Sequence, residues 1–110
     1  MKQRDLILLP FPFTDFSGRK VRPAIIISND EYNRESVDIL VVGVTSQGVK
    51  GEYSLALTQK DLEAGTLIAN CYIKVENLLK IDKRMCIKKI GTINKEKHKE
   101  IKESLQNLLR

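Results

Sequence analysis

Apolar residues in this chain fall into short runs separated by polar turns, a pattern that predicts β-strands for most of its length. The first stretch, Asp5–Phe11, ends where Pro10 and Pro12 force extended backbone and exclude a helix. Residues 22–28 contain three consecutive isoleucines, which are typical of a strand buried on both faces, and Pro23 stands near the start, where a missing N–H is tolerated. Further strands are predicted at residues 37–44, 52–57, 67–81 and 84–90, the long one with a bend near Asn77.

Helical signals are fewer and are strongest at the C-terminal end. Residues 94–109 begin at a suitable N-cap, Asn94, and then carry leucines and an isoleucine at helical spacing on an otherwise charged segment. The polar residues 29–36 predict one helical turn, and residues 58–62 predict a short capped helix closed by Gly65. Residues 14–21 and 47–51 are rich in turn formers and are predicted to be loops.

These elements together predict a mainly β fold with a C-terminal α-helix. Five or more short strands and one amphipathic helix require a small, strongly curved sheet or partly open barrel, on which helix 94–109 packs. A chain of 110 residues is long enough for one hydrophobic core, and it contains no repeat, linker or low-complexity segment. We therefore expect a single domain spanning residues 1–110.

Charge is unevenly distributed along the chain. Nineteen Lys and Arg against fourteen Asp and Glu give a net charge of +5. Residues 71–110 alone carry eleven basic and five acidic groups, whereas residues 1–70 carry eight and nine. This basic C-terminal part has two interpretations: attraction to a polyanion, or the ordinary solvated face of a helix.

Other features bear on compartment and cofactors. The N-terminal apolar run is short and broken by prolines, so it resembles neither a signal peptide nor a membrane span, and we expect a cytoplasmic protein without a membrane partner. Cys71 and Cys86 are expected to be free, buried thiols. The chain has a single histidine, His98, which we interpret as structural or solvated, and we expect no metal site and no cofactor.

Arg22 is the first candidate for chemistry, because it stands at the mouth of a buried strand. A guanidinium with five donors in a fixed fork suits a phosphate. Thr45, at the end of the next long strand, can donate a hydroxyl hydrogen bond to a phosphate oxygen. From the residues alone a second interpretation stays open, in which Arg22 lies over an apolar surface and Thr45 terminates a strand.

The order and spacing of several short motifs resemble the MazF/PemK-type toxins of toxin–antitoxin systems over nearly the whole chain. These motifs are Pro-Phe-Pro-Phe-Thr-Asp at 10–15, Ser17-Gly18, Arg22-Pro23, Thr45-Ser46 and Lys80-Ile81-Asp82. The resemblance implies a small SH3-like, partly open β-barrel of the MazF/PemK/CcdB type that forms a homodimer. It also implies a metal-independent endoribonuclease in which the ribose 2′-oxygen attacks the adjacent phosphate.

The resemblance also assigns catalytic roles by position. Arg22 matches the catalytic arginine of the family and Thr45 its catalytic threonine. Some members place an arginine and an aspartate two residues apart in the strand before Ile81-Asp82, as acid and base, and the corresponding residues here are Lys74 and Glu76. Alternation along a strand predicts that these two share one face, as a proton-transfer pair or as an ordinary surface ion pair.

Further positions match the RNA-binding parts of the family. The loop that follows the first strand matches a mobile loop over the RNA groove, and the expected RNA contacts are Ser17, Arg19, Lys20, Ser46, Gln47 and Tyr72. Phe16 and Tyr72 are candidates for stacking on bases or for packing. The chain departs from the family pattern at Arg4, where many members have a glycine before the acidic residue.

The leading hypothesis is a sequence-selective endoribonuclease that cleaves single-stranded RNA, an mRNA interferase, and is neutralised by an acidic, partly disordered antitoxin. A first alternative is a gyrase poison of the CcdB branch, which acts by protein binding and does not need the Arg22 and Thr45 pair. A second alternative is a non-catalytic barrel of the same descent that binds nucleic acid.

Overall fold

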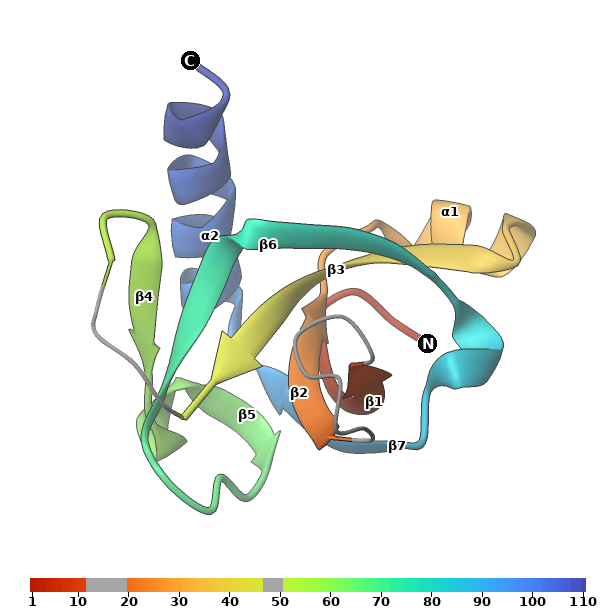
Figure 1. The fold of residues 1–110 in the computed structure, drawn as a ribbon, viewed down its shortest axis with the longest axis horizontal. Coiled ribbons are helices and arrows are strands. Elements are labelled where there is room, and N and C mark those ends of the chain that lie inside the picture. Colours follow the sequence, from red (N-terminus) through yellow and green to blue (C-terminus); the bar gives the residue numbers. More distant parts are fainter. Residues whose placement is uncertain (12–19, 47–50) are drawn as a thin grey trace.

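The computed structural model describes residues 1–11, 20–46 and 51–110 of the chain (Figure 1). The predicted loop contacts Ser17, Arg19 and Gln47, and Phe16, lie outside the described residues. The described strands form one seven-stranded sheet in the order β4–β6–β3–β2–β1–β7–β5, and every pair of neighbours is antiparallel. The strands are β1 Asp5–Phe11, β2 Lys20–Ile26, β3 Asp38–Thr45, β4 Ser54–Leu57, β5 Leu62–Gly65, β6 Cys71–Asp82 and β7 Lys88–Ile93.

The helices are α1, Asp30–Glu35, and α2, Lys95–Leu108. Asn94 is the N-cap of α2, as the sequence predicts, and its Oδ1 accepts from the N–H of Lys97 at 2.8 Å. Asn29 caps α1 in the same way, since its Oδ1 accepts from the N–H of Tyr32, although this cap was not predicted. No helix in the described part of the chain is long and apolar enough to span a membrane.

Three of the predicted elements are wrong in part. The long strand predicted at residues 67–81 begins only at Cys71. The short helix after Thr58 is a single 3₁₀ turn, η1 Gln59–Asp61, and the following Leu62–Gly65 is strand β5. Gly65 therefore closes no helix; its φ of 91° serves the close pairing of β5 with β7, where a Cβ would lie 2.3 Å from the Ile90 carbonyl oxygen. The predicted strand 84–90 begins only at Lys88, because Lys83–Met85 form a second 3₁₀ turn, η2, and β7 continues to Ile93.

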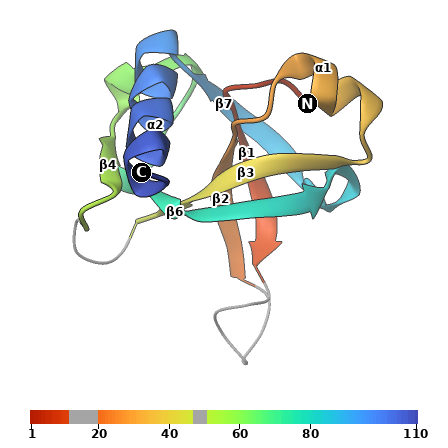
Figure 2. The same cartoon turned by 90° about the horizontal axis from the view of Figure 1, so that it is seen from above.

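The sheet curls into a partly open barrel, as Figures 1 and 2 show, so the predicted mainly β class with a C-terminal helix is confirmed. β3 and β6 run side by side through the centre, with α2 near one of their ends and α1 near the other (Figure 2). Cys71 is buried, Cys86 is half-buried, and both thiols are free.

Alternate residues of the central strands feed two separate cores, one on each face of the sheet. The first core lies under α2 and contains Leu6, Ile25, Val42, Val44, Leu57, Cys71, Ile73, Val75, Ile93 and Ile101. The second core contains Ile7, Leu9, Ala24, Ile26, Ile39, Val41 and Ile81. The isoleucine run of β2 is therefore buried on both faces, as the sequence predicts.

A bulge interrupts β6 where the sequence predicts a bend. Val42 of β3 pairs with Leu78, but the next residue, Gly43, pairs with Lys74. Residues 75–77 therefore have no partner on β3. A Cβ on Gly43 would approach Cβ of Asn77 to 3.3 Å, so the glycine makes room for the extra residues.

Arg4 precedes β1 with a φ of 81°, in the left-handed region that glycine adopts without strain. This is the position where the sequence departs from the pattern of the family that it resembles. The strained backbone is held on both sides, since its N–H donates to the carbonyl of Ile26 at 2.8 Å and its carbonyl accepts from Ile93 at 2.9 Å. Its Nη1 donates to the Ile93 carbonyl at 2.9 Å and pairs with Glu63, so the side chain links β5 to β7.

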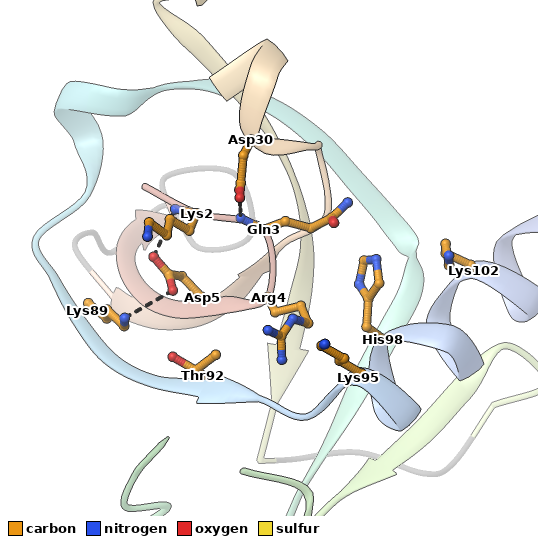
Figure 3. Close-up of a pocket in the computed structure, with 10 residues that line it drawn as sticks. All are labelled: Lys2, Gln3, Arg4, Asp5, Asp30, Lys89, Thr92, Lys95, His98 and Lys102. Atoms are coloured by element: carbon orange, nitrogen blue, oxygen red, sulfur yellow. Dashed lines mark hydrogen bonds and ion pairs between the residues drawn. The ribbon is translucent and has the colours of Figure 1, made fainter. Parts of the chain in front are cut away.

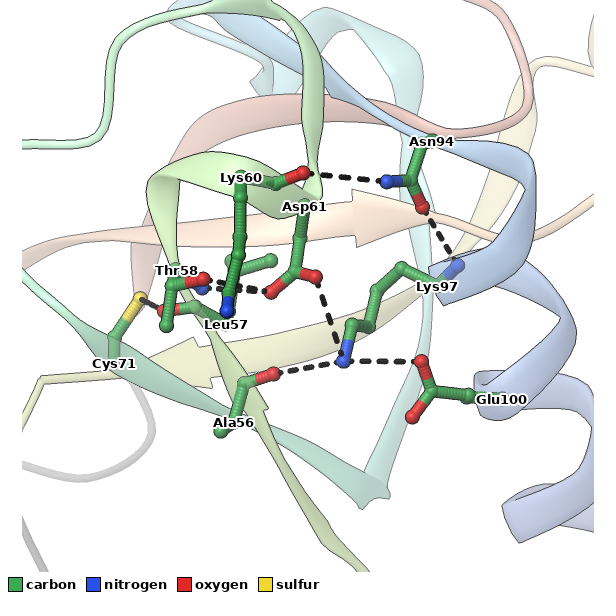
Figure 4. A network of polar contacts seen from close by, with 9 residues as sticks. All are labelled: Ala56, Leu57, Thr58, Lys60, Asp61, Cys71, Asn94, Lys97 and Glu100. Atoms are coloured by element: carbon green, nitrogen blue, oxygen red, sulfur yellow. Dashed lines mark hydrogen bonds and ion pairs between the residues drawn. The ribbon is translucent and has the colours of Figure 1, made fainter.

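A nearly buried lysine fastens α2 to the sheet (Figure 4). Lys97 is 8% exposed, and its Nζ lies 3.1 Å from the carbonyl oxygen of Ala56, 3.1 Å from Glu100 and 3.8 Å from Asp61. Asp61 in turn accepts from the N–H of Thr58 at 2.8 Å. One ammonium therefore joins α2, β4 and η1, which positions the helix over the first core.

We expect Lys97→Ala to lower the free energy of unfolding by about 2–3 kcal/mol, because it leaves the Asp61 carboxylate and the Ala56 carbonyl without their partner in a partly dry site. Chemical denaturation followed by circular dichroism measures the change. Lys99→Ala on the same helix, at an exposed lysine, is the matched control and should stay within about 0.5 kcal/mol of the parent. Equal stability of the two variants would contradict this role of Lys97.

Candidate active site

The pairing of four neighbouring strands brings the two principal candidates into one row. Arg22 of β2 lies opposite Leu9 of β1. The β2–β3 pairing reaches Ala24 and Gly43, and both Arg22 and Thr45 lie two residues beyond this last pair. Thr45 is paired with Tyr72 of β6. Arg22, Thr45 and Tyr72 therefore lie at the same end of three neighbouring strands, and we call these three residues the Arg22 row.

Alternation along the strands also places these side chains on one face. Val44 and Ile73 belong to the first core, so the residue after Val44 and the two residues flanking Ile73 face the other way. Ala24 belongs to the second core, so Arg22, two residues away, faces that same side. At the end of the central strands this face carries Arg22, Thr45, Tyr72 and Lys74.

Arg22 is only partly exposed, and its Nε is buried without a hydrogen-bond partner among the residues that the structure describes. Buried donors are normally satisfied, and an unmade hydrogen bond costs about 1–3 kcal/mol. A guanidinium held at a strand end with a donor unsatisfied is ready to bind an anionic group. Thr45 beside it is half-buried, and its hydroxyl can serve as a second donor.

Lys74 and Glu76 occupy different environments, although they are two residues apart. Lys74 is half-buried, and it pairs with Gly43 of β3 on one side and with Ser54 of β4 on the other. It lies two residues along β6 from Tyr72, which pairs with Thr45. Glu76 is exposed and lies in the β6 bulge. No ion pair joins the two in the described part of the chain. Glu76 lies four residues along β6 from Tyr72, without a partner on β3.

The predicted RNA contacts divide between the two faces. Tyr72 is half-buried within the row, consistent with a partly exposed ring at the site. Ser46 is exposed and lines an apolar pocket of about 360 Å³ with Leu8, Pro23 and Ile90, near the first core. Lys20 is the first residue of β2. Ser46 therefore lies beside the row but belongs to a different concavity.

The Ile81-Asp82 motif is structural here. Ile81 packs in the second core. Asp82 caps η2: its Oδ1 accepts from the N–H of Arg84 at 2.8 Å, and its Oδ2 lies 2.8 Å from the Arg84 guanidinium. Hydrogen bonds from the Arg84 side chain and backbone lower the pKa of Asp82 to about 2.

A second cluster of charged groups was not predicted from the sequence. Near the start of β1 a polar pocket of about 590 Å³ is lined by Lys2, Gln3, Arg4, Asp5, Asp30, Lys89, Thr92, Lys95, His98 and Lys102 (Figure 3). The signal available beforehand was the basic C-terminal part of the chain, but its residues meet the N-terminal segment only in the fold. Among the described residues no group of three or more His, Cys, Asp or Glu side chains is arranged to hold a metal ion.

Comparison with known proteins agrees with this architecture. Residues 2–109 match the family model described as PemK-like, MazF-like toxin of type II toxin–antitoxin system. A mycobacterial endoribonuclease solved with its cognate antitoxin superposes with a TM-score of 0.80 at 16% identity, covering 99% of this chain and 94% of that one. MazF in a MazE–MazF crystal structure from Deinococcus radiodurans gives 0.80 at 19% identity, with 99% and 95% covered. The Mycobacterium tuberculosis toxin MazF-mt6 gives 0.77 at 14% identity, with 96% of each chain covered. No curated protein matches the chain by sequence.

The buried, unsatisfied Nε leads to a stability prediction for Arg22. We expect Arg22→Met to leave the free energy of unfolding unchanged or to raise it by about 1 kcal/mol, because a thioether of similar length removes the unpaired donor and keeps the packing. Thermal and denaturant unfolding measure the difference. A loss above roughly 2 kcal/mol would show that the guanidinium is instead a structural partner in the fold.

Proposed function

This chain belongs to the PemK-like, MazF-like toxins of type II toxin–antitoxin systems, and on that basis we propose that it is an endoribonuclease that cleaves single-stranded RNA. The observation that carries the proposal is the Arg22 row on one face of the sheet, in which the Arg22 Nε is buried and has no hydrogen-bond partner among the described residues. Solved structures of the same fold include proteins named as endoribonucleases, some of them bound to antitoxins.

The proposed reaction needs no metal ion. The ribose 2′-oxygen attacks the adjacent phosphorus, the P–O5′ bond breaks, and the products carry a 2′,3′-cyclic phosphate and a 5′-hydroxyl. Arg22 binds the phosphate through its guanidinium and stabilises the charge that develops on the crowded phosphorane. Thr45 donates its hydroxyl to a phosphate oxygen. A guanidinium keeps its proton under ordinary conditions and is a poor proton acceptor, so the proton of the 2′-hydroxyl goes elsewhere.

Lys74 and Glu76 are the proposed proton-transfer residues. The exposed carboxylate of Glu76 accepts the proton of the 2′-hydroxyl. Lys74, which lies two residues along β6 from Tyr72, assists the departing 5′-oxygen. Tyr72 lies on the same face and can stack on a base, while Lys20 and the loop residues Ser17 and Arg19 contact phosphates without reading sequence. Sequence selectivity is part of the proposal and is assigned to contacts from Ser46 and Gln47.

The proposed partners are a cognate acidic antitoxin and a second copy of the chain. The net charge of +5 favours an acidic partner. Ile68 is fully exposed and borders the apolar pocket near Ser46, where an extended segment of a partly disordered antitoxin can bury apolar side chains. Binding there would place the antitoxin beside the Arg22 row. We assign this activity to the cytoplasm.

Cleavage depends on Arg22 and Thr45 in this proposal. With purified protein, labelled single-stranded RNA and EDTA, cleavage should persist, Arg22→Ala should lower it by at least about 10³-fold, and Thr45→Val by about 10²-fold. Thr45→Ser, which keeps the hydroxyl, and Arg34→Ala, which removes an exposed arginine of α1, are the matched controls. Loss of cleavage in EDTA, or full activity of Arg22→Ala, would overturn the mechanism.

Two other outcomes would indicate the alternative functions. Topoisomerase-linked DNA breaks with intact RNA would indicate a gyrase poison. Salt-dependent RNA binding without any cleavage product would indicate a non-catalytic RNA-binding protein.

The assignment of the base has its own test. Glu76→Gln should lower kcat by roughly 10²–10⁴-fold and remove the acidic limb of the pH–rate profile, because an amide cannot accept the proton. Lys74→Met should remove the basic limb. Glu35→Gln, at an exposed carboxylate of α1, is the control and should leave both limbs in place. An unchanged profile in Glu76→Gln would exclude Glu76 as the base while leaving the Arg22 proposal intact.

A further inference from the structure

The polar pocket at the start of β1 has the composition of an anion site (Figure 3). Five of its lining side chains are cationic, Lys2, Arg4, Lys89, Lys95 and Lys102, against two carboxylates, Asp5 and Asp30. They come from the N-terminal segment, α1, β7 and α2, so the charge concentration arises from the fold. Mutual repulsion of these cations is unfavourable unless an anion joins them.

Three of these cations form no ion pair with another described residue. Lys89 pairs with Asp5 at 3.2 Å, and Arg4 pairs with Glu63 outside the pocket. Asp30 accepts from the backbone N–H of Gln3 at 2.8 Å. In the described part of the chain no carboxylate forms an ion pair with Lys2, Lys95 or Lys102. Three exposed ammonium groups that form no ion pair among the described residues therefore line one pocket, which holds two carboxylates.

His98 supplies an independent observation. The residue is 7% exposed, lines the pocket, and its Nδ1 is buried without a hydrogen-bond partner among the described residues. Buried polar atoms are normally satisfied, so a ligand entering the pocket would meet a group that the fold leaves open. Burial, and then the positive charges of Lys102 and Arg4, lower the pKa of His98, so the imidazole is neutral at pH 7.

The first turn of α2 also contributes positive potential to the pocket. Lys95, His98 and Lys102 recur at helical spacing on one side of α2, and Lys95 and His98 lie in its first turn, where the helix dipole favours an anion. The pocket is separate from the Arg22 row: Asp5 and Leu9 stand at the two ends of a stretch of β1 about 13 Å long, with the pocket at Asp5 and the row at Leu9.

We propose that this pocket binds a phosphate group, carried by a ligand up to the size of a mononucleotide. A phosphate dianion matches three unpaired ammonium groups better than a single carboxylate does, because it offers more charge and more acceptor oxygens. The volume of about 590 Å³ exceeds what inorganic phosphate needs and falls in the range of small-ligand sites. The proposal does not depend on the ribonuclease activity, since none of its residues belongs to the Arg22 row.

His98 is the one histidine of the chain, so its ring resonances report on the pocket without assignment ambiguity. The probe is inorganic phosphate, titrated into the Arg22→Met protein at constant ionic strength maintained with chloride, which removes the guanidinium of the row as a competing site. We expect saturable shifts of the His98 ring signals and a rise in its pKa of roughly one unit, because bound phosphate offsets the nearby charges of Lys102, Lys95 and Arg4.

Two double variants, each of which removes two lysine charges, test whether phosphate binding depends on this pocket. Lys95→Ala with Lys102→Ala should weaken phosphate binding at least about tenfold, whereas Lys60→Ala with Lys99→Ala, at exposed lysines outside the pocket, should not. No saturable response up to roughly 50 mM phosphate, or equal weakening in both double variants, would overturn the proposal, since either result indicates only diffuse screening.

Two further titrations identify the source of the phosphate. Tighter binding of 5′-AMP than of inorganic phosphate would assign the pocket to a free nucleotide. Tighter binding of a 5′-phosphorylated DNA oligonucleotide than of its unphosphorylated form would assign it to the end of a nucleic-acid strand. If none of the three probes produces a saturable His98 response, the proposal is wrong, whatever the outcome of the cleavage assays.

Discussion

Burial of both faces of the central strands is the constraint on which the rest of this structure depends. β1, β2 and β3 contribute alternate side chains to two cores, so a polar side chain in the middle of these strands would meet apolar neighbours on either face. Charged groups are therefore confined to the strand ends. Arg22 and Thr45 stand at one end and Asp5 at the other, which separates the candidate active site from the basic pocket.

The parts of the fold that sequence predicts well are those governed by local pattern. β1 occupies the predicted residues, the Asn94 cap of α2 is confirmed, and Ile25 and Ile26 of β2 are buried as expected. The errors lie where tertiary pairing overrides local signals. Gly65 was interpreted as the end of a helix, but it allows close approach of β5 to β7. The start of β7 was placed too early because the capping of η2 by Asp82 was not anticipated.

In the candidate site, too, the features set by local sequence pattern were easier to predict than those set by tertiary pairing. The row of Arg22 and Thr45 follows from strand register, and motif order was enough to single out both residues. The relation of Lys74 to Glu76 was harder, because alternation assumes a continuous strand and the bulge at residues 75–77 interrupts the pairing between them. The basic pocket was missed altogether, since its residues come from four separate segments and the sequence shows only an excess of positive charge. His98 looked merely structural for the same reason.

Arg4 combines an unfavourable backbone conformation with a side-chain charge that the fold uses. Its backbone adopts a conformation that costs an arginine about 1–2 kcal/mol and a glycine almost nothing, yet its guanidinium ties β5 to β7 and contributes to the wall of the basic pocket. The backbone cost and the side-chain contacts of this residue therefore act in opposite directions on stability. Replacement of that arginine with glycine would relieve the backbone strain but would also remove the link between β5 and β7. It would then alter anion binding while leaving the Arg22 row untouched.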